Sequence, residues 1–138
     1  MRAPREDIEE KVRQWLLYAS DDLTAARHVL TLPECPGWLV ANHAQQAAEK
    51  ALKGFLVHRV VDFPFTHDIR LLLDLCSPLA DWAEQLRDAE ILTQYAVSAR
   101  YPGVGRRVAV ENARRASDLA GDVLTAVRQA LGDDGVDL

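Results

Sequence analysis

The segment ANHAQQAAEKALKGFLVHR, residues 41–59, decides the fold class, because its apolar and polar residues separate with the period of an α-helix. Its apolar arc, which begins one residue earlier, consists of Val40, Ala44, Ala47, Ala48, Ala51 and Phe55. Four donor-bearing side chains fall within about 80° of one another on a separate arc. These are His43, Gln46, Lys50 and Lys53. The alanines would allow a neighbouring helix to approach closely.

The helical period also occurs on both sides of this segment. Upstream, apolar residues follow one another at spacings of three and four: Ile8, Val12, Trp15, Leu16, Ala19, Leu23, Ala26 and Leu30. TLPECPG at 31–37 should end that helix, because proline and glycine do not easily continue one. Downstream, Pro64 breaks the pattern, and Thr66 is placed to cap a short helix through IRLLLDLC at 69–76.

Two more helices are expected in the second half of the chain. One starts at Ser77 or at Asp81 and keeps the helical period to Ala96. SARYPGVG at 98–105 is expected to be a loop. A stripe of small residues then predicts a last helix that ends near Gly132. The acidic, glycine-broken tail at 132–138 is expected to fray and to be flexible.

These elements define one fold class. Strand patterns of period two are absent, and short connections favour antiparallel neighbours. The sequence therefore predicts an all-α, five-helix antiparallel bundle that forms a single domain over residues 1–138, with its core at about 8–131. A chain of 138 residues is long enough to bury such a core without metals or disulfides.

The charge balance limits the partners that the protein can have. The formal net charge of −5 argues against a general coat for DNA or RNA. Five arginines nevertheless lie between residues 100 and 115, where Glu111 is the only acidic residue, so a local anion site is compatible with the sequence. They are Arg100, Arg106, Arg107, Arg114 and Arg115.

Cysteine usage and hydropathy predict a cytoplasmic protein. Cys35 and Cys76 lie in unrelated contexts without a CxxC pair, and MRAPREDIEE at the start lacks an apolar signal-peptide core. No apolar run approaches the roughly 18 residues of a membrane span. We therefore expect reduced thiols and a chain that does not cross a membrane.

Three motifs, in this order along the chain, carry a family resemblance. HAQQAAEKALKGFLV at 43–57, THDIRLLLDLC at 66–76 and LTQYAVSARYPG at 92–103 resemble the HEPN domain, named for higher eukaryote and prokaryote nucleotide binding. The resemblance covers roughly residues 8–131 and points to a small stand-alone prokaryotic member. It implies a bundle of four to five helices, frequent homodimerisation, and frequent pairing with a minimal nucleotidyltransferase encoded nearby.

Some members of the family are metal-independent ribonucleases, and the resemblance associates that activity with an Arg followed by four to six residues and a His. Here YPGVGRRVA follows Arg100, and the last histidine in the chain is His67. Arg59 and His67 are separated by seven residues, including Pro64. The departure argues against an enzyme. The alternative is a ribonuclease toxin with a diverged site, in which Arg100 meets His43 or His67.

The candidate site residues keep several interpretations. Three interpretations of one arc stay open, that of His43, Gln46, Lys50 and Lys53. It is either a solvated helix face with i,i+4 pairs, a surface for a dimer or partner, or a site that contacts phosphate. His67 and Asp68 cap the helix at 69–76 or belong to a site. Arg100 and Tyr101, at a Pro-Gly turn, contact a ligand or partner, or anchor the last two helices.

The resemblance implies a nucleotidyltransferase partner, and with it we expect a non-enzymatic helical dimer that holds a phosphate of ATP or GTP with Lys50, Lys53 and Arg100. A dimer is expected because four apolar residues lie off the main stripes. These are Leu17, Leu56, Val57 and Leu92. Neither His28 nor His58 has metal-ligand spacing, and Asp21 and Asp22 point in different directions, so we expect no metal and no cofactor.

Overall fold

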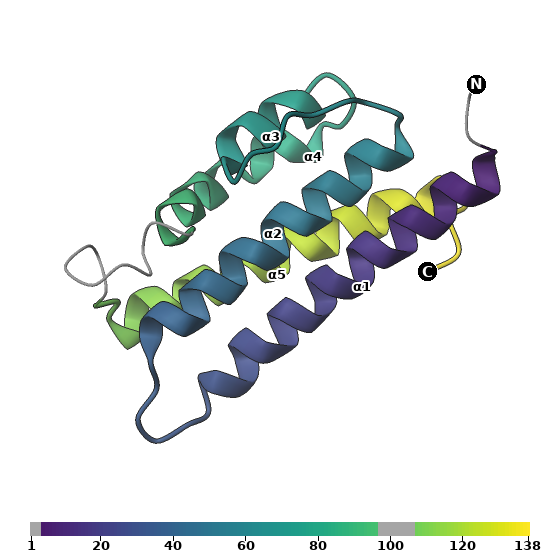
Figure 1. The fold of residues 1–138 in the computed structure, drawn as a ribbon. Coiled ribbons are helices and arrows are strands. Elements are labelled where there is room, and N and C mark those ends of the chain that lie inside the picture. Colours follow the sequence, from purple (N-terminus) through teal and green to yellow (C-terminus); the bar gives the residue numbers. More distant parts are fainter. Residues whose placement is uncertain (1–3, 97–106) are drawn as a thin grey trace.

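The computed structural model describes residues 4–96 and 107–138, and the regular secondary structure in these ranges is helical. Three long helices, α1 (Arg5–Val29), α2 (Gly37–His58) and α5 (Val110–Asp133), run along one another (Figure 1). The shorter α3 (Ile69–Cys76), α4 (Trp82–Gln85) and 3-10 helix η1 (Arg87–Tyr95) lie on the side of α2 away from α1. The predicted all-α bundle is confirmed.

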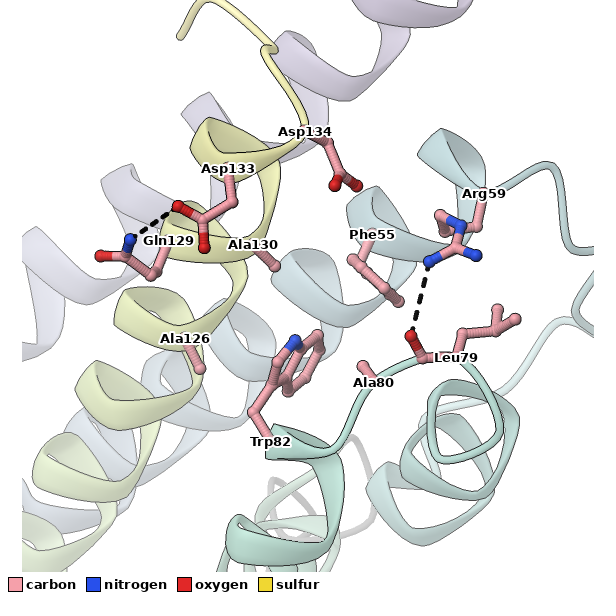
Figure 2. Close-up of a pocket in the computed structure, with 10 residues that line it drawn as sticks. All are labelled: Phe55, Arg59, Leu79, Ala80, Trp82, Ala126, Gln129, Ala130, Asp133 and Asp134. Carbon is pink, nitrogen blue, oxygen red and sulfur yellow. Dashed lines mark hydrogen bonds between the residues drawn. The ribbon is translucent and has the colours of Figure 1, made fainter.

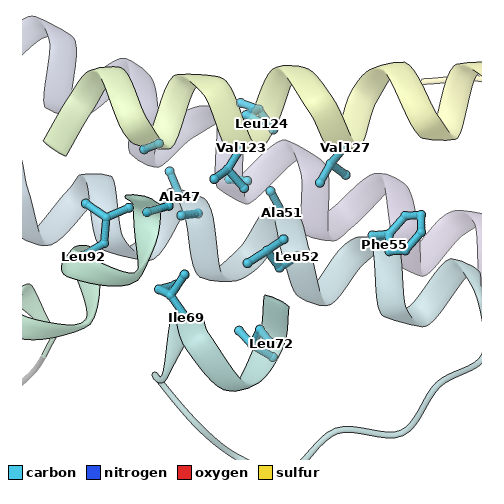
Figure 3. Packing of buried hydrophobic residues seen from close by; sticks show 14 of the residues in the cluster. Ala47, Ala51, Leu52, Phe55, Ile69, Leu72, Leu92, Val123, Leu124 and Val127 are labelled. Atoms are coloured by element: carbon cyan, nitrogen blue, oxygen red, sulfur yellow. The ribbon is translucent and has the colours of Figure 1, made fainter. Parts of the chain in front are cut away.

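Helix α2 is the centre of the bundle, because α1, α5, α3 and η1 all pack against it. All six residues of its predicted apolar arc are buried. Figure 3 shows Ala47 and Ala51 beneath Val123 and Val127 of α5, with α3 on the other side of the helix. The small alanine side chains allow this close approach of α5.

Close packing between α1 and α2 depends on Gly54. A Cβ atom built at Gly54 would lie 2.6 Å from Cδ2 of Leu16 and 3.1 Å from Cβ of Trp15. A side chain there would displace the end of the Leu16 side chain and press on Cβ of Trp15, which explains a glycine inside α2 despite its cost in helix propensity.

The helices do not all alternate in direction. Val40 near the start of α2 packs with Ala113 near the start of α5, and the ends of both helices line one cavity. Helices α2 and α5 are therefore parallel neighbours, whereas α1 is antiparallel to both (Figure 1). The reason is that the α3–η1 segment carries the chain back to the start of α2 before α5 begins.

The prediction of a single α-helix between residues 77 and 96 is wrong. The structure has the four-residue α4 followed by the 3-10 helix η1. The buried residues of η1 are Ala89, Leu92 and Tyr95, which are spaced by three. A 3-10 helix has 3.0 residues per turn, so this spacing places all three on one line that faces the core, whereas in an α-helix they would spread over about 120°.

The start of α3 also differs in detail from the prediction. Asp68, not Thr66, is the N-cap residue, and its carboxylate accepts from the backbone N–H groups of Arg70 and Leu71. Thr66 acts one step earlier, because its Oγ1 accepts from the N–H of Asp68 at 3.0 Å. The capping interpretation of Asp68 therefore agrees with the structure.

The segment after α5, for which we expected fraying, packs against the bundle. The side chain of Val136 is buried in the main core cluster, and its N–H donates to the carbonyl of Leu131 at 2.9 Å. Asp134 contacts His58 at the end of α2. Apolar burial and an ion pair thus attach the segment, although its composition is acidic and rich in glycine.

Candidate functional site

Half-buried charges join α1 to α2 at the centre of the candidate site. Asp22 of α1 accepts from Nζ of Lys50 at 2.6 Å through one carboxylate oxygen. Its other oxygen lies 3.0 Å from Nδ1 of His43. One carboxylate therefore holds two of the four donors that the sequence placed on the polar arc of α2. Gln46, one turn after His43, is half-buried at the same surface.

The fourth donor, Lys53, points into the protein. It is only 4% exposed, and its Nζ donates to Oε2 of Glu49 at 3.0 Å. This is the i,i+4 pair expected from the sequence, but it is buried and not solvated. Because a buried ammonium loses its hydration, the ion pair with Glu49 is what makes the position tolerable.

Glu49 organises a small buried network. Its Oε1 accepts from Nε2 of Gln45 at 2.9 Å and lies 2.8 Å from Nδ1 of His67. Gln45 also donates to the backbone carbonyl of His67 at 3.2 Å, which holds the start of α3 against α2. Among the described residues, Oε1 of Gln45 is the buried side-chain polar atom without a hydrogen-bond partner.

Aromatic rings surround the ammonium of Lys53. Its Nζ lies 5.7–5.9 Å from the ring centroids of Trp15, Phe63 and Phe65, within the range of a cation–π contact. Trp15 comes from α1, and the two phenylalanines come from the segment between α2 and α3. That segment folds back over Lys53 and removes it from solvent. Phe65 itself remains 91% exposed.

The four donors of the polar arc of α2 therefore do not form one continuous phosphate site. Lys53 faces Glu49 and the aromatic rings, whereas His43 and Lys50 face Asp22. A phosphate at this surface would meet Lys50 only beside an existing carboxylate, which repels it. His67 is bound to Glu49 below the cap of α3, so the structure brings it to Lys53 and not to His43. Arg100 and Tyr101 lie outside the described residues.

Sequence reasoning missed Asp22 and Gln45 as partners within the site. It considered Glu49 as the i,i+4 partner of Lys53 and, together with Asp21 and Asp22, as a ligand of Mg²⁺. Asp22 was considered only as a metal ligand, because nothing in one sequence ties a residue of α1 to His43 and Lys50 of α2. Gln45 and Glu49 read as ordinary polar positions of a helix. A usable signal existed at Glu49, since it lies four positions after Gln45 and four positions before Lys53, which places all three on one side of the helix.

The chemistry that these groups offer is hydrogen bonding and proton exchange. His43 and His67 each meet a carboxylate through Nδ1, an arrangement that orients an imidazole and leaves Nε2 for another contact. Within 4–96 and 107–138, no three His, Cys, Asp or Glu side chains gather as a metal site would require. No helix of the described chain is long and apolar enough to span a membrane.

An exposed surface surrounds the charged cluster. Tyr18 lies one turn before Asp22 on α1 and is 58% exposed. Trp15, half-buried, lines a shallow cavity of about 250 Å³ together with Tyr18 and Lys11. We refer to Trp15, Tyr18, Asp22, His43 and Lys50 as the α1–α2 face. It combines aromatic and charged groups.

Comparison with known proteins identifies the family. The model of the HEPN domain family matches residues 12–130, which is most of the chain. The protein belongs to the HEPN family. The chain is also similar to the crystal structure of TT1696 from Thermus thermophilus, with 32% sequence identity and a TM-score of 0.71. That alignment covers 86% of this chain and 97% of the other. A search among curated proteins gives no match.

Proposed function

We propose that this HEPN domain is a non-enzymatic homodimeric binding module that docks a minimal nucleotidyltransferase. The observation that supports a protein partner is the exposure of aromatic side chains next to charged groups: Tyr18 is 58% exposed and Phe65 is 91% exposed. Tyrosine and tryptophan are enriched at the centres of protein interfaces, and Trp15 and Tyr18 adjoin one another on the α1–α2 face.

The homodimer is proposed to use another side of α1. Of the four residues from which a dimer was predicted, Leu56 and Leu92 are buried and Val57 is half-buried, so only Leu17 is well exposed. Leu17 lies with Leu138 in an apolar groove of about 310 Å³ between α1 and α5, beside Arg13 and Arg128. Burial of this groove in a second copy would remove apolar surface from water.

Light scattering and co-purification test the two parts separately. We expect a mass of about twice 15.4 kDa for the purified protein and about 15.4 kDa for Leu17→Glu. Co-expression with the nucleotidyltransferase encoded nearest to the gene should yield a complex that Tyr18→Ala and Phe65→Ser weaken about tenfold. Thr24→Ala, an exposed change elsewhere on α1, is the control. A wild-type monomer contradicts the dimer, and a complex unchanged by both substitutions contradicts the docking surface.

A ribonuclease is the second candidate, and the observation that favours it is that Asp22 orients the imidazole of His43 while Glu49 orients that of His67. An oriented imidazole acts as a general base or a general acid in RNA transesterification. The binding-module proposal predicts no cleavage of single-stranded RNA or tRNA. Cleavage that resists chelators and disappears in His43→Ala or His67→Ala would replace the proposal by this alternative.

A further inference from the structure

An open cavity of about 300 Å³ lies at the opposite end of the bundle from the start of α2 (Figure 2). It is formed where α2 and α5 end, and α4 closes one side. None of the residues of the α1–α2 face belongs to it, although Phe55 of the motif at 43–57 lines its wall. Its size is at the lower end of the range of small-molecule sites, which suits a ligand the size of one amino acid.

The inner wall of the cavity is apolar. Phe55 and Trp82 meet edge to face, with ring centroids 4.9 Å apart. Ala126 and Ala130, one turn apart on α5, present only methyl groups, so room remains between α5 and the indole. Figure 2 shows the ring nitrogen of Trp82 on the edge that faces Ala130. In the described chain this indole N–H has no hydrogen-bond partner, so it is available to a ligand.

One side of the cavity attracts a cation. Because α2 and α5 are parallel, both C-terminal ends lie here, and each carries roughly half a negative charge from the helix dipole. Asp133 and Asp134 add their carboxylates. Asp134 is held by His58 at 2.8 Å, whereas Asp133 accepts only from the neutral amide of Gln129, at 3.0 Å, among the described residues.

The other side attracts an anion. The guanidinium of Arg59 lies over the ring of Phe55, 6.0 Å from its centroid, and donates to the carbonyl of Leu79 at 3.4 Å (Figure 2). No carboxylate of the described residues lies within ion-pair distance of it. An arginine with free donors is suited to bidentate binding of a carboxylate.

We propose that this cavity binds a small zwitterion with an aliphatic part, of the class of the apolar amino acids. The ammonium lies at Asp133 and Asp134, the carboxylate at Arg59 and the indole N–H of Trp82, and the aliphatic part against Ala126 and Ala130. The site is independent of the α1–α2 face. A ligand with both charges satisfies two groups that remain unpaired in the protein alone, which a ligand with one charge does not.

Titration of the ¹⁵N-labelled full chain with leucine tests the proposal by NMR. Leucinamide lacks the carboxylate and N-acetylleucine lacks the ammonium, so each removes one charge from an otherwise similar ligand. We expect leucine to shift the indole N–H signal of Trp82 and to bind at least tenfold more tightly than either analogue. Two results would contradict binding of a zwitterion. One is equal affinity for leucine and one of the analogues. The other is no shift of the Trp82 indole N–H signal at about 20 mM leucine, a concentration that would occupy even a site of millimolar Kd.

Variants of the two charged sides provide the second measurement. Arg59→Gln and Asp133→Asn are exposed changes that keep a polar side chain, and each should weaken leucine binding at least fivefold. Arg70→Gln on α3 and Asp118→Asn on α5 change exposed charges outside the cavity and should leave the affinity unchanged. If Arg59→Gln and Asp133→Asn both leave the affinity for leucine unchanged, leucine binds elsewhere and the proposal is wrong.

Discussion

Val60 has the same position at the end of α2 that Gly135 has at the end of α5. In both turns the next residue donates to a carbonyl five positions back: Val61 to Leu56, and Val136 to Leu131, each at 2.9 Å. Both positions have the left-handed backbone, with φ of 57° at Val60 and 84° at Gly135. Glycine is the usual residue of this helix-ending motif, and a β-branched residue is strained there.

Val60→Gly is therefore expected to stabilise the protein. Relief of the left-handed strain is worth about 1–2 kcal/mol, and the greater chain entropy of glycine in the unfolded state offsets about 0.5–1 kcal/mol. We expect a net gain of about 0.5–1 kcal/mol in the free energy of unfolding, measured by urea denaturation. Val60→Ala removes the side chain but keeps the strain, so it should gain less than the glycine variant.

The reverse change tests the same argument at the other helix. Gly135→Val should lower the free energy of unfolding by about 0.5–1 kcal/mol, because the strain of about 1–2 kcal/mol at a left-handed residue exceeds the roughly 0.5–1 kcal/mol gained from the smaller chain entropy of valine in the unfolded state. A Cβ atom at this position meets nothing within 4 Å, so crowding at Cβ does not add to the loss. Equal stability of wild type and Gly135→Val would contradict the strain argument.

Loss of either partner of the Lys53–Glu49 ion pair is expected to destabilise the protein. Both side chains are at least 93% buried, as their side-chain exposures are 6% and 7%. Glu49→Leu leaves the buried ammonium of Lys53 without a carboxylate, and Lys53→Met leaves the buried carboxylate of Glu49 with only Gln45 and His67 as partners. Each change should therefore cost about 3 kcal/mol of unfolding free energy. The double variant should cost less than the sum of the two.

The exposed pair of Arg13 and Glu10 is the matched control for that cycle. Its atoms lie 3.1 Å apart, close to the 3.0 Å of the buried pair, but both side chains are well exposed. Glu10→Gln should change the free energy of unfolding by less than about 0.5 kcal/mol. If Lys53→Met were equally mild, the side chain would lie in solvent in the native protein.

The two cysteines should differ in reactivity. Burial raises the pKa of the Cys76 thiol to about 12, and the side chain is inaccessible, whereas Cys35 is partly exposed. At pH 8 only about one Cys76 in ten thousand is a thiolate, the form that reacts. Iodoacetamide should therefore modify Cys35 first, as read by mass spectrometry of peptides. Both should react in urea, and equal rates in the folded protein would show that α3 opens readily.

The sequence was sufficient for features that depend on one helix. The small-residue arc of α2 is buried as its spacing predicts, and Asp68 caps α3 as its position suggests. The sequence was insufficient where contact with a second segment determines whether a side chain is buried. The helical wheel of α2 puts Lys53 with His43 and Lys50, but the segment with Phe63 and Phe65 covers only Lys53. Such a fold-back has no periodic signal in the sequence.

Local backbone states were also beyond the sequence. Spacings of three and four are both compatible with an α-helix, so the stripe of Ala89, Leu92 or Thr93, and Ala96 predicts an α-helix. It does not distinguish that helix from the 3-10 geometry in which Ala89, Leu92 and Tyr95 are buried. Val60 gave no indication of a left-handed turn, because valine is rare there. Val136 joins the core although the residues around it are acidic or glycine.

The position of Asp22 leads to a last prediction, which concerns nucleotide phosphates. Its carboxylate neutralises Lys50 at 2.6 Å and faces His43, so it competes with any anion at the α1–α2 face. Asp22→Asn leaves the shape of the side chain but removes the charge. We expect the affinity for ATP and GTP, measured by isothermal titration at low salt, to rise several-fold in this variant and to fall again in the double variant Asp22→Asn, Lys50→Ala.

Asp21→Asn, an exposed neighbour, is the control for net charge. Because the site is partly exposed, the gain should shrink at high salt. A change in affinity that is the same for Asp21→Asn and Asp22→Asn would mean that the nucleotide responds to the overall charge of the protein and does not contact Lys50.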